Sequence, residues 1–531
     1  MSRIAIIGGG ITGLSAALRV QELAVEQNRD VQITILEESD RLGGVLRTER
    51  IGEYLVEHAA DMWITNKPEG LRLCEKLGLT ERLIPTNAQF RKSLVLRDGK
   101  AHPVPEGFHL MVPEQAWPML RSPLLSWRGK LRLLAEYFVR ARRDGGDESL
   151  AEFVRRRCGD EAFQRLVQPL VGGIYTADPE KLSLKATLPR FIEMEQQHGS
   201  LIRAALHQSR GRSPSESSST SGARYGLFVS LPNGVEELVS ALSRRVAEFA
   251  DVRCGVRVLG VRALSEGGFG ILREGGGRLF EDDPLDPVSP NYWTGRPEND
   301  LSPSSGVLVG GVDVDPVILT QEQYARLIGL TWAKQFDAMI LAVPSYIAAR
   351  LLCGWQPQLA AELYRIEYAS TAVIATGHKL ADIEHPLDAF GLVIPHIERR
   401  KLLAVSFTSR KVPGRAPDGH VLLRTFVGGA LQPEIMDLGE SALLDLVRRE
   451  LRELLGVRGE PDFARILRHT EAMPQYHVGH IDLVSRIHAA SEQFRGLALA
   501  GNFLTGVGIP DSIASGEMAA DKVMKLMNSS A

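Results

Sequence analysis

The sequence predicts an α/β fold in which a Rossmann-like βαβ domain of the two-dinucleotide-binding type is joined to a mixed α+β domain and a helical region. Three observations predict this arrangement. A short apolar strand, a glycine-rich turn and a helix open the chain. A second strand–glycine–helix unit lies near its end, and the residues between change from helical to strand-like patterns. We therefore expect a first domain assembled from distant parts of the chain.

The length and composition are those of a multidomain globular protein. A single hydrophobic core seldom serves 531 residues, so two or more domains are expected. The net charge of −3 gives no reason to expect nucleic-acid binding. Four cysteines lie far apart, without a CxxC pair, so neither a metal site nor a disulfide framework is predicted. They are expected to be free thiols in a reducing compartment.

The N-terminal apolar run is broken by glycines and leads directly into a strand, which is unlike a signal peptide. No stretch approaches the roughly 18 consecutive apolar residues of a membrane span. We therefore expect a cytoplasmic protein that is not integral to a membrane.

The first unit contains a GxGxxG motif in its full context. The strand Ile4–Ile7 precedes it and a helix follows, and Glu37 ends the next strand 24 positions after Gly13. Gly8 suits the tight turn, Gly10 leaves room for a pyrophosphate, and Gly13 lets the helix pack closely. The backbone N–H groups of the helix N-terminus would bind the phosphates. The predicted phosphate-binding residues are Gly8, Gly9, Gly10, Ile11, Thr12 and Gly13.

The residues after the second strand favour FAD over NAD. Glu37 can accept hydrogen bonds from the adenosine ribose, with Glu38 beside it. Arg41-Leu42-Gly43-Gly44-Val45 then follows at once. Such a glycine-containing extension is typical of flavoproteins in which the chain covers the diphosphate, so Arg41, Gly44 and Val45 are candidate cofactor contacts. The alternative for Arg41 is a surface arginine.

The middle of the chain is expected to hold a helix over 66–86, a hairpin over 93–105 and helices over 107–170. The helical stretch is basic at its start, where Arg121, Arg128, Lys130 and Arg132 lie among tryptophans and leucines. A face resting on an anionic membrane and an ordinary solvated face both fit that pattern.

Later segments alternate between low complexity and strand patterns. Residues 209–222 are predicted to be a disordered linker, and the glycine-, proline- and acid-rich residues 264–330 an insertion. A helix over 235–249, a strand over 252–261 and a buried parallel strand over 336–344 belong with the first domain. Strand-like runs over 370–430 predict a second, antiparallel sheet.

The C-terminal unit runs from a short strand ending at Gly501 to a helix that starts near Pro510. The helix N-terminus would point at the flavin pyrimidine, where negative charge grows on reduction. Val507, Gly508 and Ile509 are the candidate contacts.

At this point the chain resembles the porphyrinogen oxidases of heme biosynthesis, within the amine-oxidase-like flavoproteins. The resemblance rests on the two glycine motifs, on Leu94 to Gly107, and most specifically on Gly173-Ile174-Tyr175 with Asp178-Pro179-Glu180-Lys181-Leu182-Ser183. It covers almost the whole length.

The resemblance implies non-covalent FAD and oxidation of a porphyrinogen, coproporphyrinogen III or protoporphyrinogen IX, in three two-electron steps, with oxygen giving hydrogen peroxide. Hydride would pass to flavin N5, and no side-chain base is assigned. By resemblance Val258 contacts the adenine, and Ala59, Ala60, Asp61 and Met62 pass under the flavin ring. Relatives often carry Gly-Pro there, so this chain departs from the pattern. Asp61 is similar to the bacterial coproporphyrinogen-type members, which favours coproporphyrinogen III.

Cations are expected near the hairpin for the substrate's propionates, and Arg91, Lys92 and Arg97 are the candidates by resemblance; each could instead be a surface residue. The domain assignment is 1–64, 226–263, 331–350 and 480–531 for FAD, 65–105 and 351–479 for substrate, and 106–208 for the helical region. Transfer of product to a ferrochelatase, a homodimer and a membrane surface remain open as interactions.

Three rival functions remain open at this stage. They are a non-covalent flavin amine oxidase, a carotenoid-desaturase-like enzyme and a flavin-binding heme-pathway partner without turnover. No cysteine follows Cys353, which excludes amine oxidases that attach FAD through a cysteine near the C-terminal motif.

Overall fold

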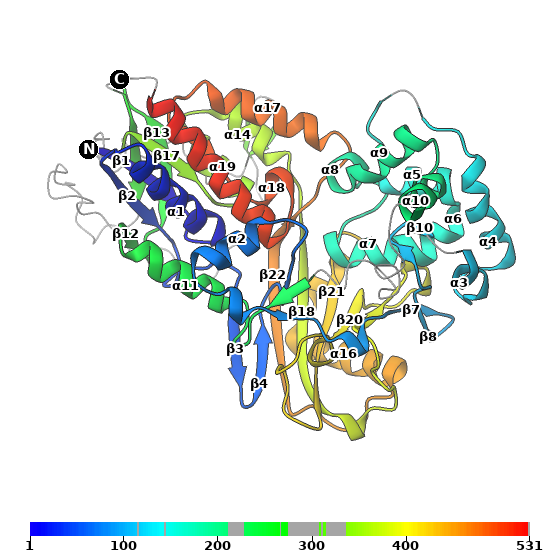
Figure 1. Cartoon of the computed structure of the whole chain (residues 1–531). Helices are drawn as coiled ribbons and strands as arrows, with labels where there is room; N and C mark the ends of the chain where they lie inside the picture. Colours follow the sequence, from blue (N-terminus) through cyan, green and yellow to red (C-terminus); the bar gives the residue numbers. More distant parts are fainter. Residues whose placement is uncertain are drawn as a thin grey trace.

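The computed structural model describes residues 1–113, 116–142, 145–210, 228–265, 267–273, 307–309, 312–314 and 336–528. Figure 1 shows three parts: a domain that contains both chain ends at the left, a large sheet at the lower centre, and a group of helices at the right. The predicted α/β fold with a mixed second domain and a helical region is confirmed.

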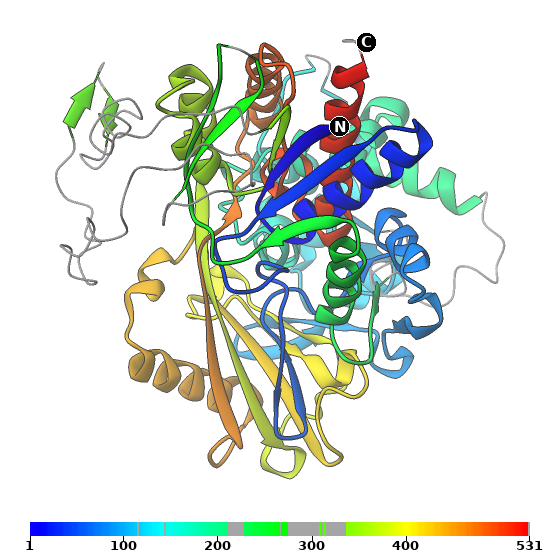
Figure 2. The same cartoon turned by 90° about the vertical axis from the view of Figure 1, so that its left-hand side faces the viewer.

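A five-stranded parallel sheet forms the core of the first domain. Its order is β12-β2-β1-β17-β23, and the strands are β1 (Ser2–Ile7), β2 (Val31–Leu36), β12 (Ala250–Arg253), β17 (Ala338–Leu341) and β23 (Leu497–Leu499). Residues from both ends of the chain are thereby brought into one sheet, as Figure 2 shows from the side.

Helices cover both faces of this sheet, because successive strand residues point in opposite directions. Ile4 and Ile6 pack with α1 (Ile11–Glu26), α11 (Glu236–Ala247) and α19 (Ile509–Asn528). Ala5 and Ile7 pack on the other side with α13 (Ser345–Leu352), α14 (Pro357–Tyr364) and α17 (His480–Glu492). Helix α2 (Glu69–Lys76) joins the first of these cores.

The second sheet has seven strands in the order β22-β18-β21-β20-β19-β7-β8. These are β7 (Ser93–Arg97), β8 (Lys100–Pro103), β18 (Tyr368–Lys379), β19 (Gly391–Val393), β20 (Ala404–Phe407), β21 (His420–Gly428) and β22 (Phe463–Pro474). The predicted hairpin is β7–β8. The sheet is antiparallel as predicted, except that β19 pairs with β7 in parallel. Helix α16 (Glu440–Leu455) covers one face.

The helical region packs around its own core. Its helices are α3 (Ala116–Arg121), α4 (Trp127–Leu134), α5 (Leu150–Cys158), α6 (Asp160–Ala162), α7 (Gln168–Tyr175), α8 (Leu184–Thr187), α9 (Pro189–His198) and α10 (Leu201–Arg210). A π-helical turn, Phe163–Val167, comes directly before α7. Such turns are frequent at functional sites.

Short elements connect the three parts. They are the hairpins β3 (Thr48–Ile51)–β4 (Tyr54–Glu57) and β13 (Val258–Ala263)–β14 (Phe269–Arg273), the small sheet of β5 (Trp63–Ile64), β11 (Phe228–Ser230) and β6 (Ile84–Pro85), and the helices α15 (Thr408–Lys411) and α18 (Asn502–Thr505).

The structure differs from the sequence-based expectations at several boundaries. The strand expected over 252–261 is divided into β12 and β13, because a turn at Gly255 separates them. Residues 69–79 and 345–366 pack with the parallel sheet, so the expected domain boundaries at 65 and 351 fall too early. The predicted linker lies outside the described residues from 211 onward, as does most of the insertion over 264–330. Among the described helices, none is long and apolar enough to span a membrane.

Candidate active site

The glycine-rich turn between β1 and α1 has two kinds of glycine. Gly8 adopts φ +106°, and a Cβ there would lie 2.3 Å from the Ala342 carbonyl oxygen. A Cβ on Gly13 would lie 2.0 Å from the Gly8 carbonyl oxygen. A Cβ on Gly10, in contrast, would meet no atom within 4 Å. The fold itself requires Gly8 and Gly13, whereas Gly10 borders open space at the N-terminus of α1, where an anion is favoured.

A second glycine loop faces this space. The Gly43 N–H donates to the Gly9 carbonyl over 2.8 Å, and a Cβ on Gly44 would lie 3.4 Å from Gly10 Cα. The Arg41 guanidinium donates to the carbonyl oxygens of Leu42, Gly44 and Leu46, which fixes the loop's shape. Val45 extends from the loop with 58% of its surface exposed. The two loops thus border the open space at Gly10, here called the groove at Gly10, and this arrangement suits a diphosphate.

Glu37 is held in place by the backbone of this groove. Its Oε2 accepts the Gly9 N–H over 2.6 Å and its Oε1 accepts the Ser39 N–H over 2.9 Å. Each carboxylate oxygen can accept further bonds from ribose hydroxyls. Glu38 pairs with Arg257 over 3.1 Å, and the Val256 N–H donates to the Glu37 carbonyl over 2.9 Å, so the chain just before Val258 is attached to Glu37 and Glu38.

The second glycine motif lies before α19. Gly506 adopts φ +129°, and its N–H donates to the Tyr476 hydroxyl over 2.7 Å. That hydroxyl donates in turn to the Asn502 carbonyl, and the ring stacks on His480 with 4.2 Å between centroids. Burial raises the pKa of Tyr476, so the phenol stays protonated and keeps donating. Tyr476 therefore fixes the loop from Asn502 to Gly506 that leads into α19.

The segment 59–62 lies between the two glycine motifs. Ala59 and Ala60 pack against the core of the parallel-sheet domain, and Met62 is half-buried. Asp61 is buried beside Lys411 and Arg424. Lys67, further along, pairs with Asp511 in the first turn of α19. This segment therefore connects the groove at Gly10 with the N-terminus of α19.

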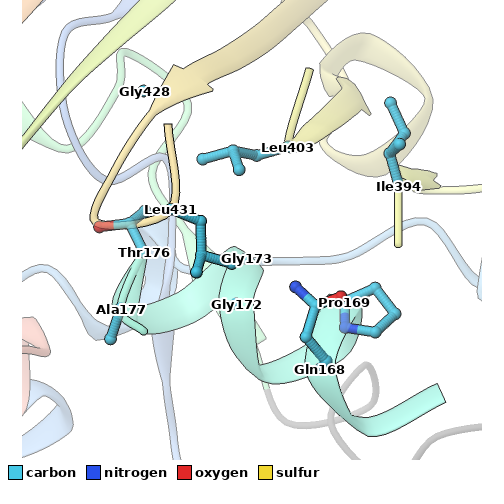
Figure 3. Close-up of a pocket in the computed structure, with 10 residues that line it drawn as sticks. All are labelled: Gln168, Pro169, Gly172, Gly173, Thr176, Ala177, Ile394, Leu403, Gly428 and Leu431. Atoms are coloured by element: carbon cyan, nitrogen blue, oxygen red, sulfur yellow. The ribbon is translucent and has the colours of Figure 1, made fainter. Parts of the chain in front are cut away.

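A cavity lies between α7 and the seven-stranded sheet. Figure 3 shows α7 along one side, with Leu403 and Ile394 across from it. The lining is apolar or small except for Gln168 and Thr176. The full lining is Gln168, Pro169, Gly172, Gly173, Thr176, Ala177, Ile394, Leu403, Gly428 and Leu431. Helix α7 ends at Thr176, which adopts φ +47° and accepts the Ala430 N–H over 2.9 Å. That bond attaches the end of α7 to the sheet.

Two tyrosines join this cavity to the C-terminal motif. Tyr175 follows Gly172 and Gly173 on α7, and its ring centroid lies 6.5 Å from that of Tyr476. Tyr476 is the residue that accepts the Gly506 N–H. Val507 packs against the hydrophobic core of the helical region. A ring bound at the N-terminus of α19 would therefore lie next to the cavity.

Comparison with known proteins decides which family has this arrangement. The model of the family described as flavin containing amine oxidoreductase matches residues 11–283 and 317–524. This chain belongs to that family. Coproporphyrinogen III oxidase of Bacillus subtilis is 30% identical over 98% of this chain and 97% of its own length. The enzyme of the same name from Propionibacterium freudenreichii is 31% identical over 98% and 90%. Protoporphyrinogen oxidase 2 of Arabidopsis thaliana is 26% identical over 99% and 94%.

A solved structure named "Putative protoporphyrinogen oxidase", from Exiguobacterium sp., matches with a TM-score of 0.77 at 24% identity. The match covers 99% of each chain, and it supports the fold. The fold, the resemblance to porphyrinogen oxidases and the FAD cofactor predicted from the sequence are thereby confirmed. In this flavin-containing amine oxidoreductase, the open groove at Gly10 and the two glycine motifs fit a dinucleotide cofactor.

The three cations predicted to bind propionates lie apart from the cavity's lining. Lys92 pairs with Asp388, and Arg97 bonds the Pro123 carbonyl and Asp98. Arg91 is half-buried and donates to the Thr86 carbonyl over 3.4 Å. Their role in binding substrate stays a prediction.

Three residues of this site were not predicted from the sequence. Arg424 interrupts the apolar run Val421–Phe426, and a charged residue inside a buried strand could have indicated an internal ion pair. Lys411 lies in an ordinary polar stretch, so nothing local marked it. Tyr476 likewise stands in a mixed segment, and only the fold brings it to Gly506.

Proposed function

We propose that this protein oxidises coproporphyrinogen III to the porphyrin with FAD as cofactor. The observation that carries the proposal is similarity along 98% of the chain to coproporphyrinogen III oxidases, at 30% and 31% identity. Coproporphyrinogen III oxidase of Staphylococcus aureus is 27% identical, and the protoporphyrinogen oxidases are 24% to 27% identical, so the two most similar of these enzymes carry the preference. Bound FAD supplies a two-electron acceptor beside the substrate.

For the cofactor, we propose that the groove at Gly10 holds the pyrophosphate and that Glu37 binds the ribose. The loop from Arg41 to Val45 would close over the diphosphate. The segment Ala59 to Met62, together with Gly501 and residues Val507 to Ile509, would hold the ring end, and Val258 would contact the adenine. These contacts make Gly10 the position where an added side chain should weaken FAD binding without disturbing the fold, because no protein atom lies within 4 Å of a Cβ there.

For the substrate, we propose the region between α7 and the seven-stranded sheet. Its present cavity of about 10 Å³ holds little more than one water molecule, so these walls must move apart to admit the ring. A porphyrinogen is a large ring with an apolar centre and acidic side chains, so it needs an apolar slot and cations at its edge. Glycines at 172, 173 and 428 leave the cavity wall flat, since they carry no side chain. Arg91, Lys92 and Arg97 stay the candidates for edge cations, and each would have to leave a present partner to bind a carboxylate.

The reaction balances without a protein acid or base. Each of three steps removes a hydride from a methylene bridge and one proton. Over the three steps, two of the protons leave pyrrole nitrogens and the third leaves the fourth methylene bridge by tautomerisation, so that all four bridges become CH. Three molecules of oxygen would accept the six electrons and six protons as three molecules of hydrogen peroxide. The chain's own residues need to bind the substrate, orient it towards the flavin and exclude water.

Substrate choice is tested by comparing coproporphyrinogen III with protoporphyrinogen IX. We expect porphyrin fluorescence to rise at least about tenfold faster with coproporphyrinogen III, since a site built for four carboxylates leaves cations unpaired around a two-carboxylate ring. Three equivalents of hydrogen peroxide should form per porphyrin. Equal rates, or a preference for protoporphyrinogen IX, would contradict the substrate assignment.

We also propose that the start of the helical region contacts a membrane surface. Trp117, Trp127 and Phe138 are exposed to 62%, 69% and 78%. Arg121 stacks over Trp117, and Arg128 is exposed beside Trp127. Large exposed aromatic residues beside cations suit an anionic bilayer. Two of the four basic residues noted in the sequence are not exposed as free cations on this face, although Lys130 Nζ lies 4.6 Å from the Trp127 ring centroid. Lys130 is buried and donates to the Leu120 carbonyl, and Arg132 donates to carbonyls at the end of α5.

The membrane proposal is tested with one triple variant that carries Trp127→Ser, Arg128→Glu and Phe138→Ser. We expect it to sediment with anionic vesicles at least about fivefold less than the unchanged protein, because each change removes an apolar or cationic contact. Raising the salt concentration should weaken binding of the unchanged protein. Arg458→Glu, at an exposed position distant in sequence, is the matched control. Equal sedimentation of all three proteins would overturn the proposal.

A further inference from the structure

The path of residues 58–67 places this segment along the proposed cofactor. At one end, the His58 N–H donates to the Arg47 carbonyl over 2.8 Å, three residues beyond Gly44. At the other end, Lys67 pairs with Asp511 of α19. A dinucleotide with its pyrophosphate at Gly10 and its ring at the N-terminus of α19 must therefore pass this segment. This step rests on the FAD arrangement proposed above.

The middle of the segment is held by side chains from other parts of the molecule. The Asp61 carboxylate lies 2.7 Å from Lys411 Nζ and 3.4 Å from Arg424 Nη1. The second terminal nitrogen of Arg424 donates to the Ala59 carbonyl. The Ser230 hydroxyl donates to the Asp61 carbonyl over 2.8 Å. Arg424 thus contacts the turn at both Ala59 and Asp61, from strand β21 of the seven-stranded sheet.

The charges of this group do not cancel. The side chains of Asp61, Lys411 and Arg424 are exposed to only 11%, 14% and 2%. Burial alone would raise the pKa of Asp61, but Lys411 and Arg424 outweigh it and lower that pKa to about 2. Asp61 is therefore ionised at neutral pH. Nearby, Glu57 and Arg415 form a second buried pair of opposite charge, 3.8 Å apart. Two cations against one carboxylate leave an excess of positive charge beside Ala59 and Ala60.

We propose that Asp61, Lys411 and Arg424 form an ionic clamp that positions the Ala59–Asp61 turn against the flavin and raises the flavin's reduction potential. Positive charge in a water-poor site favours the electron-rich form of a neighbouring group. The turn is held from outside by ion pairs, so its own backbone need not be rigid. All three are positioning residues.

Two substitutions test the clamp with opposite expected signs. Asp61→Asn removes a negative charge and should shift the reduction potential of bound FAD upward. Lys411→Met removes a positive charge and should shift it downward. Both should weaken FAD binding at least about tenfold, because either loss loosens the turn. Lys411→Arg should restore both properties towards those of the unchanged protein. Lys401→Met, which removes a cation from an exposed pair with Glu434, should change neither.

The potential is measured by titrating the bound flavin against a redox dye and following its absorbance. Shifts of opposite sign in Asp61→Asn and Lys411→Met support the proposal. Shifts of the same sign, or no shifts, would overturn it. Equal FAD affinities in Lys411→Met and Lys411→Arg would also overturn it. If Asp61→Asn does not fold, the reduction potentials and FAD affinities of Lys411→Met and Lys411→Arg are compared instead. In both variants Arg424 still pairs with Asp61. No porphyrinogen enters this measurement, so failure of the proposed substrate would leave its result intact.

Discussion

Replacing Gly10 with alanine should weaken FAD binding at least about a hundredfold while leaving the FAD-free protein as stable as the parent. A Cβ at Gly10 meets no protein atom within 4 Å, and the backbone there has φ −69° and ψ 175°, which alanine adopts freely. The methyl group would occupy the space proposed for the pyrophosphate. The loss of about 2.7 kcal/mol or more falls on binding alone. FAD titration and urea unfolding of the FAD-free protein measure the two effects separately.

Gly13→Ala is the matched control for this prediction. Its Cβ would lie 2.0 Å from the Gly8 carbonyl oxygen, so the helix must move away from the strand. We expect the FAD-free protein to lose roughly 2 kcal/mol or more, because the added atom overpacks the core. If Gly10→Ala bound FAD as the parent does, the pyrophosphate would not lie at this turn.

Replacing Arg157 with methionine should destabilise the helical region by about 3–5 kcal/mol. The Arg157 side chain is fully buried and pairs with Glu136 and Glu195, themselves exposed to only 1% and 3%. Methionine keeps most of the volume but leaves two carboxylates without this partner. Arg155→Met is the control: Arg155 pairs with Glu180 at the surface, where such pairs contribute less than about 1 kcal/mol. Thermal unfolding in the absence and presence of FAD compares the two variants.

The pH dependence of the Arg157 variant has a defined sign. Burial raises the pKa of Glu195, but Arg156, the Arg142 N–H and Arg157 outweigh it and hold that pKa below its usual range. A carboxylate with a lowered pKa contributes stability that is present at neutral pH and is lost as pH falls through the lowered value. Without Arg157 the pKa of Glu195 is lowered less, so acidification should remove less stability from the variant than from the parent. Equal unfolding midpoints for the Arg155 and Arg157 variants at neutral pH would contradict the predicted role of the buried network.

Local patterns were sufficient to predict the parts of the fold that depend on local chemistry. Gly8, Gly10 and Gly13 follow a strand and open a helix, and each has a distinct steric reason that the sequence context anticipates. The alternation of Ile4 and Ile6 with Ala5 and Ile7 similarly reflects two buried sheet faces. Helices α2 and α14 pack with the parallel sheet and not with the part of the fold expected for them, because an amphipathic helix does not indicate which core it joins.

The contacts that complete the site are distant in sequence. Asp61 meets Lys411, at the end of α15, and Arg424, on β21, only in the folded chain, because both lie far from it in sequence. Tyr476 reaches Gly506 across the boundary between two parts of the fold. Lys130 and Arg132 were expected on a basic face, yet their side chains donate hydrogen bonds to backbone carbonyls of the helical region. Such roles depend on long-range packing, which residue type and spacing do not specify.

The central claim is that a porphyrinogen reduces FAD bound between the two glycine motifs. It is tested most directly by mixing the FAD-loaded protein with coproporphyrinogen III in the absence of oxygen and following the flavin absorbance. We expect the absorbance to bleach within a single turnover and to recover, with porphyrin fluorescence, when air is admitted. If the flavin is bound and remains oxidised with coproporphyrinogen III and with protoporphyrinogen IX, this protein is not a porphyrinogen oxidase.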